Sequence, residues 1–234
     1  MSRVFLTAEW RKLILFTYKV PQEMLLPHLP RGLELDTIEG NAFASLVAFD
    51  FINTRVKSRK IPFHVNFPEI NLRFYVKEKE TGRRGVVFIR EFVPKFFISF
   101  IANRIYNEPY RSIKMKSLIS VKDAVQIKHI IKYKRREFFV TAEGKNEPYL
   151  PGEDTKEHFF KEHSWGYGAN RRGQTLVYQV EHPVWQVYPL ITCDNNFDFA
   201  FLYGAKWSFL NGAETYSVML AEGSGVKVFS AEKL

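Results

Sequence analysis

The sequence offers little that could form covalent cross-links or anchor it in a membrane. It contains one cysteine, Cys193, in 234 residues, which excludes an internal disulfide and is typical of a reducing compartment. No apolar run approaches the roughly 18 residues that a membrane-spanning helix needs. The first residues lack a long apolar stretch followed by small residues, so no secretion signal is predicted. We therefore expect a cytoplasmic protein that does not enter the membrane.

Several catalytic signatures are also missing. The sequence has no G-x-S-x-G motif for a serine nucleophile, and its G-S-G at 223–225 lacks the lysine and helix of a phosphate-binding loop. His158 and His163 are five residues apart, which places them about 140° apart around a helix and not on one face as in a zinc pair. No cysteine pair or other ligand spacing indicates a metal. We expect neither a metal nor a cofactor.

Positive charge is in excess. Lysine and arginine outnumber aspartate and glutamate by 34 to 25, which gives a net charge of +9 and favours anionic partners such as nucleic acid, anionic membranes or small acids. The basic residues cluster at 55–60, 83–84, 132–136 and 171–172. No recognisable nucleic-acid-binding module accompanies them, so the pattern favours an ordinary basic surface over a nucleic-acid site.

Strand-forming residues dominate the apolar composition, with 22 phenylalanines and 11 tyrosines. The pattern predicts strands at 11–20, 33–36, 41–55, 69–76, 86–93, three within 111–143, and further strands at 174–182, 184–192, 214–221 and 225–230, the last two flanking the turn-like E-G-S-G. Short helices are predicted at 21–30, 94–106, 155–163 (with a capping box from Asp154 to Glu157) and 198–203, and a loop at 164–173. No repeat or linker is present, so we expect one domain, 1–234, built on a curled or closed antiparallel sheet.

The most informative stretch is the strand that follows His64. Between residues 69 and 76 it alternates strictly, with Glu69, Asn71, Arg73 and Tyr75 on one face and apolar residues on the other. Glu69 and Arg73 are about 13 Å apart on a straight strand, too far to pair, but both can converge on a group lying across Asn71. One interpretation is the polar wall of a ligand pocket with Arg73 as the anion anchor; the alternative is a solvated sheet face.

Three other side chains are candidates. Trp165 and Trp185 lie in the polar segments H-S-W-G-Y-G and E-H-P-V-W-Q, and large aromatics with a polar N–H often line small-molecule pockets, although plain core packing explains each as well. Lys114 lies in R-S-I-K-M-K. A lysine in an apolar strand can lose its proton and become a nucleophile, and the alternative is an ordinary outward lysine.

Six segments, taken in order, carry a family resemblance: W-R-K-L-I-L-F-T-Y-K-V-P, L-P-R-G-L-E-L-D, S-L-V-A-F-D-F, P-F-H-V-N-F-P-E-I-N-L-R-F-Y-V, A-N-R-I-Y-N-E-P-Y and H-P-V-W. Together they resemble the bacterial YqjF-like group of uncharacterised proteins, which is similar in overall fold to acetoacetate decarboxylase. The resemblance implies an α+β, mostly β fold of the double-sheet, β-barrel-like kind, with an internal cavity and a few short helices. It strengthens the pocket interpretation of the Glu69 face.

The resemblance carries over only part of the decarboxylase chemistry. Those enzymes use a Schiff-base lysine next to a second lysine, with an arginine and carboxylates around the pair. Arg11 falls at the arginine position, whereas Arg111 and Ser112 fall at the two lysine positions, and arginine cannot form an imine. Lys114 would need a gap in the overlay, and Glu69 is out of register with the family's acids. The fold is implied, while the reaction is left open.

Three hypotheses follow. The first is a pocket for a small organic anion of the carboxylate type, and its residues are Arg73 as anchor, Arg11 or Arg111 as a second contact, Glu69 and His64 as acid–base candidates, Asn71 and Tyr75 as orienting groups, and Trp185 in the wall. The second is an imine-forming decarboxylase that uses Lys114, with lyase-like chemistry on a small keto or organic acid. The third is a non-enzymatic basic protein that binds nucleic acid or anionic lipid. The sequence also leaves assembly into a homo-oligomer open.

Overall fold

The protein is built mainly from long, largely apolar strands. The computed structural model describes residues 3–94, 110–161 and 163–234. The strands in these ranges are β1 (Val4–Val20), β2 (Leu33–Leu35), β3 (Ala42–Val56), β4 (Phe67–Glu78), β5 (Arg84–Val93), β6 (Tyr110–Ser112), β7 (Lys114–Val121), β8 (Ala124–Tyr133), β9 (Arg136–Lys145), β10 (Trp165–Ala169), β11 (Thr175–Glu181), β12 (Val187–Tyr188), β13 (Leu190–Asn195), β14 (Ser217–Phe229) and β15 (Glu232–Lys233). The helical segments are short: α1 (Gln22–Leu25), α3 (Lys156–Lys161) and α4 (Phe199–Tyr203), with 3₁₀ turns η1 (Leu26–His28) and η2 (Ala205–Leu210). None of these helices has the length and apolarity that crossing a bilayer demands.

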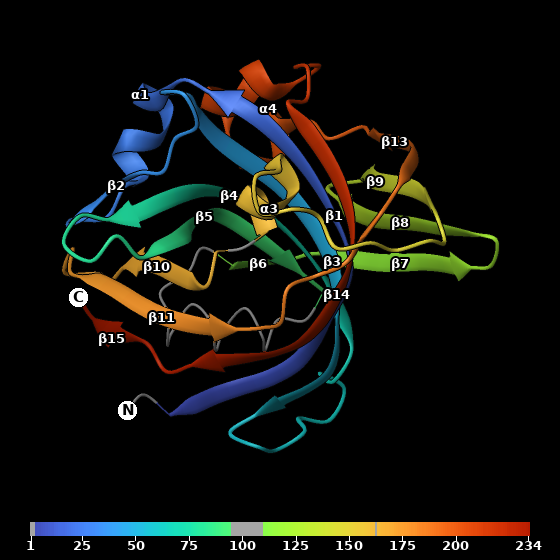
Figure 1. The fold of residues 1–234 in the computed structure, drawn as a ribbon, viewed down its shortest axis with the longest axis horizontal. Coiled ribbons are helices and arrows are strands. Elements are labelled where there is room, and N and C mark those ends of the chain that lie inside the picture. Colours follow the sequence, from blue (N-terminus) through green and yellow to red (C-terminus); the bar gives the residue numbers. More distant parts are fainter. Residues whose placement is uncertain (1–2, 95–109, 162) are drawn as a thin grey trace.

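The main sheet curls until it closes on itself. Its hydrogen-bonded order is β14, β1, β3, β4, β5, β10, β11, and β11 then pairs with β14 through Val180–Val228 and Glu181–Lys227. The long strands β14, β1 and β3 run side by side along the curve (Figure 1). The inner face carries its own apolar cluster, which includes Leu13, Phe43 and Phe49. Closure therefore creates an interior that is separate from the rest of the core.

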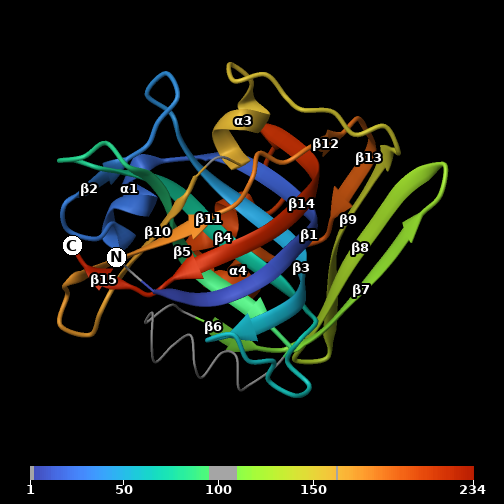
Figure 2. The same cartoon turned by 60° about the horizontal axis from the view of Figure 1, so that its bottom comes forward.

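A second sheet packs against the outside of the first. It has the order β13, β9, β8, β7, and Figure 2 shows β7 and β8 standing at the side of the molecule. The core between the sheets contains Ile14 and Phe16 from β1 together with Ile127 and Val140 from β8 and β9. The helical segments α4 and η2 also contribute to this outer core, for example through Trp207. The double-sheet architecture that the family resemblance implies is thus confirmed.

A partly buried polar group joins the two sheets. Ser117 on β7 donates a hydrogen bond to Asp50 on β3 at 2.5 Å, and its oxygen lies 2.8 Å from Nδ1 of His129 on β8. Burial lowers the pKa of His129. Because the proton of Ser117 points to the carboxylate and not to the imidazole, the histidine does not activate this serine as a nucleophile. The group is a structural tie between the sheets.

Most predicted elements are present, with local differences. The strands predicted at 11–20, 41–55, 69–76 and 86–93 lie within β1, β3, β4 and β5, although β1 begins earlier, at Val4. The segment 164–173, predicted as a loop, contains β10, and the strand predicted at 184–192 is replaced by β12 and β13. In α3 the backbone N–H of His158 bonds to Oγ1 of Thr155, so Thr155 and not Asp154 supplies the capping oxygen. The helix predicted at 94–106 lies outside the described residues, apart from its first.

The prediction of two separate strands, 214–221 and 225–230, around E-G-S-G was wrong. The segment belongs to a single strand, β14, which pairs with β1 along nearly its whole length. Gly223 has φ +80°, and a Cβ added to it would collide with the backbone oxygen of Trp10 on β1. The glycine therefore allows two long strands to approach closely, instead of reversing the chain.

Gly223→Ala should destabilise the protein, because alanine meets both an unfavourable backbone conformation and the backbone of Trp10. We expect a loss of about 2 kcal/mol or more in the free energy of unfolding, measured by urea denaturation and far-UV circular dichroism. The control is Gly225→Ala in the same strand, where no heavy atom lies within 4 Å of the added Cβ. Equal stability of the two variants would contradict this account of β14.

Candidate functional site

A cavity of about 130 Å³ lies inside the closed main sheet. Its wall is largely apolar and includes Trp10, Phe49, Phe51, Phe67 and Phe88. Side chains from β1, β3, β4, β5, β10, β11 and β14 all contribute. A protein cavity of about 150 Å³ holds a molecule of the size of benzene, so this cavity fits a small organic molecule.

Strand β4 supplies the central polar part of the wall. Glu69, Asn71 and Arg73 line the cavity and are almost completely buried. The alternating residues Ile70 and Leu72 face the outer core, so both faces of β4 are covered. The period of two in the sequence arises from this arrangement, in which one face packs against apolar side chains and the other carries buried polar groups.

Glu69 is held by hydrogen bonds on both carboxyl oxygens. Asn71 donates to Oε1 at 3.0 Å, and the hydroxyl of Tyr110 donates to Oε2 at 3.3 Å. Glu91, opposite Asn71 on β5, is also buried and lines the cavity. Burial raises the pKa of Glu69 to about 7, although hydrogen bonds and the charge of Arg73 act in the opposite direction. Glu69 can therefore exchange a proton near neutral pH.

Arg73 is a buried cation with spare hydrogen-bonding capacity. It is 9 % exposed, and one of its terminal nitrogens donates to the backbone oxygen of Phe160 at 3.2 Å. Its Nε has no hydrogen-bond partner among the described residues, and no described carboxylate forms an ion pair with it. The guanidinium lies 5.8 Å from the centre of the Tyr75 ring. A buried charge with so little compensation is costly, so an anionic partner would stabilise it.

Tyr75 supports the site from its edge. It is buried, and its hydroxyl lies 2.5 Å from Oγ of Ser45, which in turn contacts Thr17. Its ring is covered by Phe160 and by His163, whose ring centre is 4.8 Å away. Tyr75 is therefore not one of the described residues that line the cavity. Its contacts position Arg73 and His163, and they do not present its hydroxyl to the cavity.

The sequence did not identify His163, Asp36 or Glu91 as part of a pocket. His163 lines the cavity, and its Nε2 lies 3.3 Å from Oδ2 of Asp36, which also accepts a hydrogen bond from Arg84 at 2.6 Å. Burial lowers the pKa of His163 to about 4, while the hydrogen bonds from His163 and Arg84 lower the pKa of Asp36 despite its burial. Because 127 residues separate His163 from Asp36, no local spacing could have paired them.

Unpaired polar atoms gather on the cavity wall. The buried side-chain atoms without a hydrogen-bond partner in the described chain include five in the wall: Trp10 Nε1, Thr54 Oγ1, Asn71 Oδ1, Arg73 Nε and His163 Nδ1. Buried polar atoms are almost always hydrogen-bonded, and each one that is not calls for an explanation. Their concentration around one cavity is typical of a site that binds a polar molecule.

Two other candidates, His64 and Trp165, also line the cavity. The ring nitrogen Nδ1 of His64 lies 2.7 Å from the backbone oxygen of Pro62, so the loop after β3 fixes this side chain. Trp185 is buried elsewhere in the inner core, where its Nε1 donates to Ser224 at 2.8 Å. Trp185 is not among the described residues of the cavity wall.

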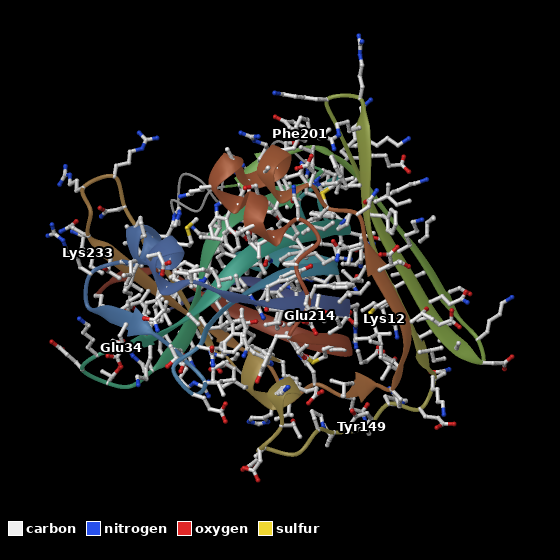
Figure 3. All side chains as sticks on the ribbon, turned by 90° about the horizontal axis from the view of Figure 1, so that it is seen from above. Lys12, Glu34, Tyr149, Phe201, Glu214 and Lys233 are labelled. Atoms are coloured by element: carbon white, nitrogen blue, oxygen red, sulfur yellow. The ribbon has the colours of Figure 1, made fainter. Side chains whose placement is uncertain are left out.

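Arg11 lies outside the cavity. Its guanidinium forms ion pairs with Glu9 at 2.6 Å and Glu222 at 3.5 Å. The cause is an irregularity in β1 at Lys12, which has φ 56° and shifts the register with β3. Lys12, labelled in Figure 3, bonds to Tyr188 and Glu222 on this outer side.

Arg111 and Lys114 are likewise away from the cavity. Both are exposed, and Arg111 donates to the hydroxyl of Tyr133 at 3.0 Å. Lys114 lies opposite Lys132 in the second sheet. An exposed lysine lacks the desolvation that makes a lysine nucleophilic, so the position of Lys114 removes the support for an imine at this residue.

Within the described ranges, no three His, Cys, Asp or Glu side chains lie close enough together to hold a metal ion. Since this finding covers only the described residues, the expectation that the whole chain binds no metal stays a prediction.

The fold is similar to that of several solved structures. Acetoacetate decarboxylase from Legionella pneumophila superposes with a TM-score of 0.69 at 14% identity, covering 98% of this chain and 87% of that one. An acetoacetate decarboxylase-like enzyme from Sphingomonas wittichii RW1 gives a TM-score of 0.68 at 11% identity, with 99% and 94% of the two chains covered. The enduracididine biosynthesis enzyme MppR, complexed with pyruvate, gives 0.67 at 10% identity over 100% and 91%. At these identities the similarity establishes the fold alone.

The sequence is also similar to one described protein and to one protein family. The uncharacterized protein YqjF from Bacillus subtilis (strain 168) is 32% identical over 109 residues, which are 46% of this chain and 44% of that protein, so the match spans less than half of its length. The DUF2071 family, described as an uncharacterized conserved protein, matches residues 7–224. The resemblance that the six sequence segments indicate is confirmed, and the chain belongs to the DUF2071 family.

Proposed function

We propose that the cavity binds a small organic anion of the carboxylate type and that Arg73 is its anchor. The observation that carries the proposal is the state of Arg73, a buried guanidinium on the cavity wall without a described carboxylate partner. A bound carboxylate would accept charge-assisted hydrogen bonds from it and compensate its charge. Arginine suits this role because its planar group matches a carboxylate.

The other wall residues set the size and orientation of the ligand. A cavity of about 130 Å³ with aromatic walls favours an acid with a small apolar body. Asn71, whose amide nitrogen is bound to Glu69, has its oxygen left to accept a hydrogen bond from the ligand. Tyr75 acts indirectly, by packing against Arg73. The pyruvate complex of MppR is consistent with a ligand of this size in a protein of the same fold.

A second function, proton transfer on the bound acid, is favoured by Glu69. Its pKa of about 7, raised by burial, lets it act as acid or base at neutral pH. The substrate would be a small keto or organic acid held by Arg73. The reaction class is lyase-like chemistry at the carbon next to the carbonyl group of that acid. His64 on the same wall is the other acid–base candidate. This proposal does not use Arg11, Arg111, Lys114 or Trp185.

The remaining features of the protein are also proposals. We infer a single domain, 1–234, that works in the cytoplasm, and we leave assembly into a homo-oligomer open. Binding of nucleic acid or anionic lipid has less support, because the basic clusters carry no recognisable module.

Arg73→Met should abolish ligand stabilisation by small acids. We expect benzoate, pyruvate or butyrate to raise the melting temperature of the wild type, and the affinity of the variant for the same acid to fall at least about tenfold, since charge-assisted hydrogen bonds are lost. Thermal-shift titration and calorimetry measure both. Arg136→Met, which removes an arginine from an exposed ion pair with Asp198, is the control and should respond like the wild type. If Arg73→Met kept the wild-type affinity, the anchor would be wrongly assigned.

Glu69 should make stability depend on pH. Between its ordinary pKa of 4.5 and its folded pKa of about 7, the folded protein binds a proton that the unfolded chain releases, so stability falls as the pH rises through this window. Glu69→Gln removes this effect. The free energy of unfolding of the variant, relative to that of the wild type, should therefore rise by on the order of 3 kcal/mol between pH 4 and pH 8, as measured by urea denaturation. Glu147→Gln, at an exposed position, should leave the wild-type slope intact; parallel curves for Glu69→Gln and wild type would refute the raised pKa.

A further inference from the structure

His163 is a buried imidazole whose two ring nitrogens have different surroundings. Nε2 faces Oδ2 of Asp36 at 3.3 Å, whereas Nδ1 has no hydrogen-bond partner among the described residues. The side chain is 1% exposed and belongs to the cavity wall. One nitrogen is therefore bound to the protein, and the other is buried without a hydrogen-bond partner among the described residues.

The partner of Nε2 determines where the proton lies. Asp36 also accepts a hydrogen bond from Arg84 at 2.6 Å, and these contacts lower its pKa, so Asp36 is a carboxylate that can only accept. Nε2 must then carry the proton. Burial and the nearby cations Arg84 and Arg73 keep the ring neutral at neutral pH, because they lower its pKa to about 4. The free Nδ1 is left with a lone pair and acts as an acceptor.

The ring is also fixed in orientation. It packs against Tyr75 with 4.8 Å between ring centres and against Phe159 with 5.4 Å. Asp36 restrains the same ring from its Nε2 side. Such a ring cannot turn its acceptor nitrogen away without breaking its contacts, and a fixed acceptor is selective for ligands that present a donor.

Arg73 and His163 belong to the same cavity wall, and the charge of Arg73 acts on the imidazole of His163. The guanidinium of Arg73 and the ring of His163 both pack against Tyr75, at 5.8 Å and 4.8 Å from its ring centre. The wall therefore offers a cationic donor for an anionic group and, beside it, an acceptor for a donor group. An ammonium donor would be repelled by Arg73 and Arg84, whereas a hydroxyl would not.

We propose that Nδ1 of His163 accepts a hydrogen bond from a hydroxyl group of the bound anion, and hence that the cavity selects small hydroxy acids over the same acids without the hydroxyl. This inference rests on the proposed anion-binding function and adds the ligand class. Asp36 is then a positioning residue that fixes the tautomer and orientation of His163, and His163 contacts the ligand.

The test compares matched acids by calorimetry: lactate with propionate, 3-hydroxybutyrate with butyrate, and 3-hydroxybenzoate with benzoate. For at least one pair the wild type should bind the hydroxy acid about fivefold more tightly, the factor that one neutral hydrogen bond contributes. His163→Phe keeps an aromatic ring against Tyr75 without the acceptor, and it should lose this preference while its affinity for the plain acid changes less than about twofold. The control is His182→Phe, in which a histidine stacked on Trp185 is replaced and the preference is retained.

The outcomes separate the two proposals. Acids that bind through Arg73 without any hydroxyl preference, or a preference that survives in His163→Phe, would overturn the role of His163 alone. If none of the six acids bound, the anion-binding function would itself fail, and the hydroxy-acid inference with it.

A measurement on the wild type covers the case in which His163→Phe does not fold. Long-range ¹H–¹⁵N NMR spectra at pH 7 should show the proton of His163 on Nε2 and an unprotonated Nδ1. The Nδ1 resonance should shift when the preferred hydroxy acid is added and should not shift to the same extent with its plain counterpart. A proton on Nδ1 in the free protein would contradict the proposal directly.

Discussion

The organisation of this protein depends on the burial of charge inside a closed sheet. Arg73, Glu69 and Glu91 lie in an interior whose walls are otherwise mostly aromatic and aliphatic. In such surroundings a charge is stabilised only by a partner or by loss of its ionisation. Glu69 responds with a raised pKa, and Arg73 has the backbone oxygen of Phe160 but no described carboxylate. The incomplete compensation of Arg73 is what distinguishes the cavity from an ordinary core.

Several separate features of the fold together form this interior. The pairing of β11 with β14 closes the sheet, and the close approach of β14 to β1 at Gly223 lets both strands stay long. The irregularity at Lys12 moves Arg11 to the outer surface, while Trp10 and Leu13 on either side remain in the cavity wall. Phe160 from α3 contributes a backbone oxygen and an aromatic ring to the inner side. The site is therefore a product of the whole closed sheet and not of one loop.

The sequence predicted those parts that depend on local pattern. The alternation in β4 identified Glu69, Asn71 and Arg73 as one face, because a strand has a fixed period of two. The family resemblance supplied the fold, which the pattern of strands alone left open between curled and closed sheets. The sequence could not place Arg11, because a single irregular residue reverses the side on which a strand residue points. It also could not pair Asp36 with His163, since that contact arises only after closure brings distant segments together.

The similarity to acetoacetate decarboxylase establishes the fold, and no lysine is among the described residues of the cavity wall. Lys114 is exposed on the second sheet, and Arg111 is exposed near it, so neither contributes to the described cavity wall. The polar groups that line the cavity include an arginine, two carboxyl groups, one amide and a neutral histidine. These groups suit recognition of an anion and transfer of a proton, and they need no imine.

A crystal structure of the protein grown with benzoate would test the central claim most directly. The account predicts a carboxylate inside the closed sheet, with an oxygen at hydrogen-bond distance, about 2.7 to 3.2 Å, from Nε of Arg73. A cavity without the anion, in which Arg73 instead forms an ion pair with Glu69 or Glu91, would contradict it.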